Sequence, residues 1–185
     1  MKKPTINRRG FTLIEIIVVI FVTSIMLLGF LSLYEWHGKV YNYQQAVIRV
    51  SGSSRSSMQA FSLYTSQAYR VLSDSGSYST DINTLILQVP SINDSGDVIS
   101  AKWDTVIFYK SGTNLFLLIQ PDASSSRPAV NKILSDTLQS LSFNYNNANF
   151  DLITKVTVDM TNSIQLRTQA VTARAQGDAY LKNYY

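Results

Sequence analysis

The stretch Arg8-Arg9-Gly10-Phe11-Thr12-Leu13-Ile14-Glu15, followed by apolar sequence as far as Leu33, decides the fold of this chain. Between Phe11 and Leu33, Glu15 is the only residue with an ionisable side chain. At ~1.5 Å of rise per residue this run forms a helix of roughly 35 Å, which is long enough to cross a bilayer. The sequence therefore predicts a membrane-spanning helix close to the N-terminus.

The flank before this helix is basic. Lys2, Lys3, Arg8 and Arg9 precede it, and the first ten residues contain no acidic side chain. Such a charge bias holds a short N-terminal tail on the cytoplasmic side, so we expect the rest of the chain to lie outside the cytoplasm. The apolar run is longer than that of a secretory signal peptide and passes Gly29 without a small-x-small cleavage site, which argues against that class of signal.

Glu15 is unusual in such a helix. A carboxylate inside hydrocarbon costs on the order of 2.5 to 3.5 kcal/mol even on lenient insertion scales, so the residue predicts a function and a partner.

The segment Arg9-Gly10-Phe11-Thr12-Leu13-Ile14-Glu15, with the apolar run behind it, resembles the type III signal of type IV prepilins and type II secretion pseudopilins. The resemblance implies that a prepilin peptidase cuts after Gly10 and methylates the new N-terminus at Phe11. It also implies that Glu15 pairs with the Phe11 amine during assembly. The implied partners are sister pilins or pseudopilins and an inner-membrane platform protein with an assembly ATPase.

Beyond the membrane segment, apolar residues continue at spacings of three and four, which predicts an amphipathic helix as far as Leu72. This stripe includes Trp36, Tyr43, Val50 and Phe61, and its apolar register fails at Ser54 and Ser57, where we expect a bend. The family resemblance implies an α+β, type IV pilin-like fold, in which this helix packs on an antiparallel β-sheet. The expected regions are a cleaved cytoplasmic leader (1–10), a transmembrane or filament-core helix (11–34), its amphipathic half (35–72) and an exported β-rich domain (73–185).

Strand-like segments follow at 84–89, 105–110, 115–120, 141–145 and 153–160, with a hairpin connection at 110–114. Residues 131–141 fit either a helix or a strand, and we favour a turn that leads into the strand at 141–145. We further expect a turn at 161–163, a last strand at 164–171 and a frayed or edge segment at 172–185. Residues 130–175 loosely resemble the J-type minor pseudopilins.

Composition disfavours several other function classes. The chain has 16 Lys and Arg against 12 Asp and Glu, and four of the basic residues lie in the leader, so the mature chain balances at 16 − 4 − 12 = 0. This balance argues against a nucleic-acid partner. Cysteine is absent and His37 is the single histidine, which leaves no thiolate chemistry, no His-based metal site and no base for a hydrolase triad. We expect no enzyme activity, cofactor or metal.

Two alternatives to a structural pilin or pseudopilin subunit remain. The chain could be a membrane-anchored binding module that does not polymerise, or a competence pseudopilin that serves DNA uptake. Gly10 together with Glu15 favours the assembling subunit, because an ordinary membrane anchor needs neither residue.

Overall fold

The computed structural model describes residues 11–167 and 169–182. Its first element is the helix α1 (Leu13–Gln67), which runs through the boundary between two compact units at Gln44 and Gln45. The long N-terminal helix predicted from the sequence is confirmed, but it ends at Gln67 and not at Leu72. Arg70–Val71 instead forms the short strand β1 and pairs with β4 at Gln88 and Leu87.

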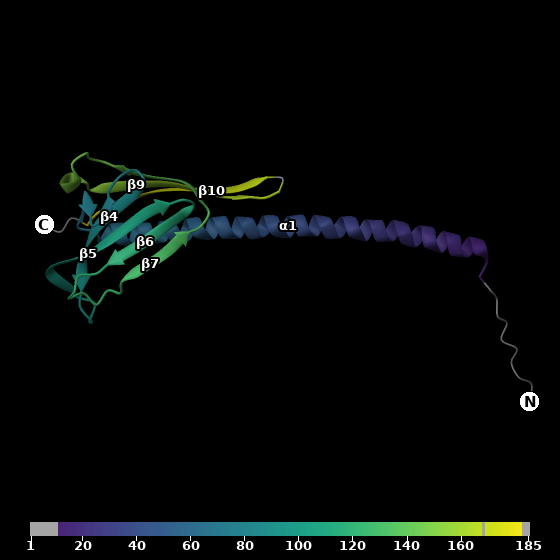
Figure 1. Cartoon of the computed structure of the whole chain (residues 1–185), viewed down its shortest axis with the longest axis horizontal. Coiled ribbons are helices and arrows are strands. Elements are labelled where there is room, and N and C mark those ends of the chain that lie inside the picture. The colour runs from purple at the N-terminus through teal and green to yellow at the C-terminus, as the bar shows by residue number, and fades with distance from the viewer. Residues whose placement is uncertain (1–10, 168, 183–185) are drawn as a thin grey trace, which may run out of the picture. The chain divides into compact units, whose positions relative to one another are not determined.

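The second unit, from Gln45 onward, contains two antiparallel sheets, and Figure 1 labels their strands β4, β5, β6, β7, β9 and β10. The five-stranded sheet has the order β1-β4-β5-β6-β7, with β4 (Thr84–Ile92), β5 (Val98–Ser111), β6 (Asn114–Gln120) and β7 (Val130–Ser135). The three-stranded sheet has the order β10-β9-β8, with β8 (Leu138–Tyr145), β9 (Lys155–Gln165) and β10 (Ala170–Tyr180). A short hairpin of β2 (Asp74–Ser75) and β3 (Tyr78–Ser79) and the 3-10 helix η1 (Phe150–Leu152) complete the unit.

The second half of α1 packs against both sheets. Phe61 lies at the centre of this contact. The centroid of its ring is 6.4 Å from the ring centroid of Phe108 on β5 and 6.1 Å from that of Phe143 on β8. All three side chains are buried in one apolar cluster. A single helix face thus joins the two sheets through one core, which confirms the expected α+β, pilin-like architecture.

The buried face of α1 contains polar residues. Ser54 and Ser57 are buried between Val50 and Phe61, and the helix passes through them without interruption, so the expected bend does not break it. Strand β9 supplies a hydrogen-bond partner for one of them. The amide nitrogen of Asn162 on β9 donates a 2.7 Å hydrogen bond to the Ser54 hydroxyl, and both residues are buried.

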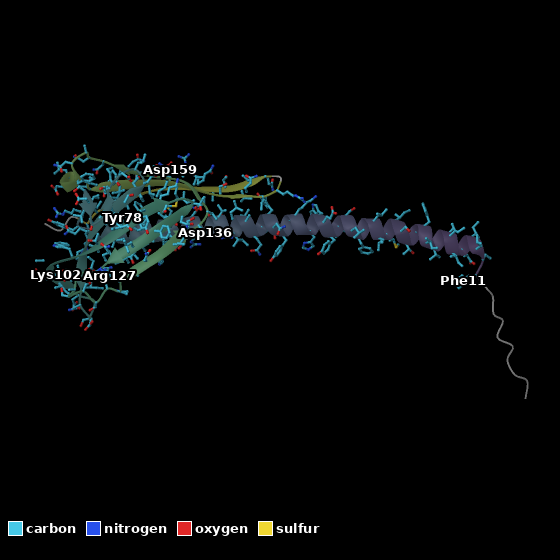
Figure 2. The ribbon with its side chains drawn as sticks, viewed as in Figure 1. Phe11, Tyr78, Lys102, Arg127, Asp136 and Asp159 are labelled. Carbon is cyan, nitrogen blue, oxygen red and sulfur yellow. The ribbon has the colours of Figure 1, made fainter. Side chains whose placement is uncertain are left out.

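A second buried polar group ties the loop after β6 to the sheet. Asp104 on β5 is fully buried, and its carboxylate accepts hydrogen bonds from the Ser91 hydroxyl (2.8 Å), the Asp122 backbone N–H (2.9 Å), the Ser125 hydroxyl (2.9 Å) and Nε of Arg127 (2.8 Å). Burial raises the pKa of Asp104, but these donors outweigh it, so the pKa lies below its ordinary value. Arg127 and Lys102 lie near the same end of the five-stranded sheet (Figure 2).

Several predicted strands are confirmed, and others needed correction. Strand β4 continues through Pro90, because a register shift between Pro90 and Ile92 tolerates the missing N–H. Residues 131–141 form parts of two strands, β7 and β8, and not a turn leading into one. The segment 161–163 belongs to β9, and most of the expected frayed tail is strand β10, since β9 and β10 pair over their whole length.

Candidate processing and assembly segment

The predicted cleavage site lies at the beginning of the described chain. Gly10 and the basic residues before it fall outside the described residues, so the structure begins at Phe11, whose side chain is 82% exposed. Figure 2 labels Phe11 next to the first turn of α1. The residue that the predicted cleavage would make N-terminal is therefore exposed at the start of the helix.

Glu15 lies in the first turn of α1, where it caps the helix. Its Oε2 accepts hydrogen bonds from the Thr12 backbone N–H (2.9 Å) and from the Thr12 hydroxyl (2.9 Å), and the Thr12 hydroxyl accepts from the Glu15 backbone N–H at 3.3 Å. This reciprocal arrangement is a capping box, which satisfies backbone donors that the first turn of a helix leaves unpaired. The predicted pairing of Glu15 with a Phe11 amine requires a cleaved chain and remains a prediction.

Thr12 is not among the residues that the sequence motif predicted for this site. Its signal was available, because a Thr followed three residues later by Glu, directly before an apolar run, is typical of a capping box. Thr12 gives Glu15 a structural task that is independent of assembly, so any test of the Glu15 charge has to preserve the cap.

The helix surface that follows is apolar on all sides. Every large apolar side chain from Leu13 to Leu33 is between 45% and 77% exposed. None of the most apolar stretch of α1 is buried within the described part of the chain. By length and composition this segment can cross a membrane, and its exposure distinguishes it from the core helix of a globular domain.

The few hydroxyl groups in this segment are satisfied within the helix. Thr23, Ser24 and Ser32 donate hydrogen bonds of 2.7, 2.8 and 3.0 Å to the backbone carbonyl oxygens four residues earlier. Groups that find their partners inside their own helix can enter hydrocarbon at low cost. The polar residues of the segment are thus compatible with lipid.

His37, the single histidine, is exposed on α1. Within residues 11–167 and 169–182, no three His, Asp or Glu side chains are grouped so that they could hold a metal ion.

In comparison with known protein families, residues 6–31 match the prokaryotic N-terminal methylation motif. The matched segment contains Gly10, Phe11 and Glu15 and most of the exposed apolar helix. The chain is type IV prepilin-like or pseudopilin-like. No curated protein and no solved structure matches the chain. The matched motif ends at residue 31, whereas the resemblance to J-type minor pseudopilins concerns residues 130–175. That resemblance therefore stays a prediction.

The methylation motif implies processing of this prepilin-like chain by a prepilin peptidase and assembly with other pilins. Together with the long exposed helix it also indicates membrane anchoring.

Proposed function

We propose that the chain is a structural subunit of a type IV pilus or of a type II secretion pseudopilus. A prepilin peptidase cleaves the precursor after Gly10 and methylates Phe11, and the mature chain then assembles with sister subunits through its apolar helix. The observation that carries this proposal is a methylation motif continuous with a helix whose apolar surface is exposed on every side. An inner-membrane platform protein and its ATPase drive the assembly, and the subunit itself catalyses no reaction.

Before assembly the subunit resides in the cytoplasmic membrane as a single-pass protein. The basic residues of the leader favour a cytoplasmic N-terminus, which places the β-rich unit outside the cytoplasm. The apolar helix then leaves the lipid for the interior of a filament. Both environments are apolar, so the same side chains serve both states.

Glu15 has two roles in this scheme. In the precursor it caps the helix through Thr12. Cleavage creates an ammonium group at Phe11, one helical turn from Glu15, and a buried ammonium group needs a carboxylate partner on its own chain or on its neighbour. We propose that the charge of Glu15 serves this second role.

Glu15→Val and Glu15→Gln separate the two roles. Val removes both the cap and the charge, whereas Gln keeps an oxygen that can accept the Thr12 N–H but carries no charge. Both variants should still be cleaved after Gly10, as measured by intact mass, and both should enter sheared filaments at a level reduced by about tenfold or more, because the Phe11 ammonium is left unpaired. Normal assembly of Glu15→Gln beside poor assembly of Glu15→Val would assign Glu15 to the cap alone.

Gly10→Leu is the processing control. It should block cleavage and leave the basic leader attached, which N-terminal analysis of membrane fractions detects. A mature N-terminus beyond Gly29 would contradict processing by a prepilin peptidase. A wild-type chain that is cleaved but forms no crosslinks to sister subunits would instead support the non-polymerising binding module.

A further inference from the structure

Four large aromatic residues follow the apolar segment of α1 and are exposed. Tyr34, Trp36, Tyr41 and Tyr43 are 80%, 64%, 55% and 43% exposed. The sequence pattern placed Trp36 and Tyr43 on the stripe that packs against the sheets, but burial of α1 begins only at Ala46. These aromatic side chains therefore need another environment.

The four residues do not share one helix face. Tyr34 and Trp36 are two residues apart, which is about 200° around the axis at 3.6 residues per turn. Tyr41 and Tyr43 each lie seven residues further on and repeat the same two directions. Figure 2 shows side chains projecting from both sides of α1. Aromatic rings on opposite faces of a helix at one level are typical of a membrane interface.

The charged residues of α1 independently mark the same position along the helix axis. No Asp, Glu, Lys, Arg or His occurs from Ile16 to Tyr34, and Glu35, His37 and Lys39 follow at once. From Glu15 to Glu35 a helix rises about 30 Å, which equals the thickness of a hydrocarbon core. The two carboxylates thus bracket a segment of the length that lipid requires, and the aromatic pair Tyr34 and Trp36 lies at its C-terminal end.

We propose that Tyr34 and Trp36 form an aromatic belt that lies among the lipid headgroups and sets the depth of the helix in the membrane. The amphipathic rings place their apolar bodies against acyl chains and their OH or N–H groups in the hydrated layer. Glu35 then lies at the first polar level. Glu15 lies at the opposite boundary of the hydrocarbon and not within it, which lowers the cost of its charge and leaves Phe11 outside the acyl chains.

This inference rests on the proposed membrane-resident stage of the chain. Its test measures the depth of Trp36, using the fact that the chain has two tryptophans. Trp103→Phe leaves Trp36 as the single fluorophore, and phenylalanine can keep the ring stacking of Trp103 on Tyr69, whose centroids are 4.8 Å apart. The full-length chain is reconstituted in phosphatidylcholine vesicles whose acyl chains are brominated either near the headgroup or near the terminal methyl group.

Bromine near the headgroup should quench Trp36 at least about twofold more strongly than bromine near the terminal methyl group. The matched control moves the fluorophore inward by combining Leu28→Trp with Trp36→Phe and Trp103→Phe. This position is about 12 Å deeper along the helix, so the order of the two quenchers should reverse. If Trp103→Phe does not fold, the difference between wild type and Trp36→Phe gives the same measurement.

Two results overturn the proposal in distinguishable ways. If Leu28→Trp is quenched by the deep bromine while Trp36 is unquenched or also prefers the deep bromine, the belt is wrong but membrane residence stands. If neither position is quenched by either lipid, the helix is not in the bilayer, and the membrane-resident stage of the proposed function fails together with the belt.

Discussion

Asp104→Ala should be among the most destabilising single substitutions on the polar residues of the second unit. It removes a buried carboxylate that accepts four hydrogen bonds, including one from Arg127, whose side chain is only 12% exposed. Removal of one partner of a buried ion pair leaves the other charge uncompensated, which costs about 3–5 kcal/mol. With a urea m-value of ~2 kcal/mol/M, the midpoint of unfolding should fall by about 2 M.

The assay is the urea-induced unfolding of a chain that lacks residues 1–35, monitored by its circular dichroism. Asp178→Ala is the matched control, since Asp178 pairs with Lys155 at 3.2 Å on the surface with side chains that are 45% and 33% exposed. Exposed pairs contribute about 0–1 kcal/mol, so this variant should unfold within about 0.5 M of the parent chain. Equal losses for Asp104→Ala and Asp178→Ala would refute the stabilising role of the buried pair.

The pH dependence supplies a second check on Asp104. Its pKa is lowered in the folded chain, so its contribution to stability is complete above the unfolded pKa of about 3.9 and is lost as pH falls through the lower folded pKa. The difference in unfolding free energy between the parent chain and Asp104→Asn should therefore stay constant near neutral pH and shrink below about pH 4. A difference that shrinks between pH 8 and pH 6 would contradict the assignment.

Three other experiments test the fold. The chain that lacks residues 1–35 should give circular dichroism with both helix and strand signals, and a purely helical spectrum would contradict the architecture. Ser54→Ala should lower the unfolding free energy by about 1–3 kcal/mol, because it leaves the amide of Asn162 unpaired. Ser57→Ala should be neutral or slightly stabilising, because the buried Ser57 hydroxyl has no hydrogen-bond partner in the described part of the chain. The opposite order of the two variants in urea titrations would contradict this hydrogen-bond network. Gly177→Val should cost only about 1 kcal/mol, because a Cβ there would meet Cε of Met58, the far end of a flexible side chain that can move aside, and the loss should be smaller when Met58→Ala is also present.

The N-terminal part of this protein follows from local sequence alone. The segment from Phe11 to Leu33 predicts its own structure, because a membrane-length helix satisfies its own backbone and needs no contact with the rest of the chain. The same locality explains why the capping box at Thr12 and Glu15 could have been found from its spacing.

Tertiary contacts determine which polar residues of the second unit are buried and where its last strand forms. Ser54 and Ser57 have a low local preference for helix, yet both lie on the buried face of an uninterrupted helix, and Asn162 on β9 supplies a hydrogen-bond partner for Ser54. Strand β10 lies in a segment with weak local preference for strand and forms because β9 offers eleven residues of pairing. Local preferences are worth tenths of a kcal/mol per residue, whereas long-range pairing and burial contribute about 1 kcal/mol per group or more, so the distant contacts determine these elements.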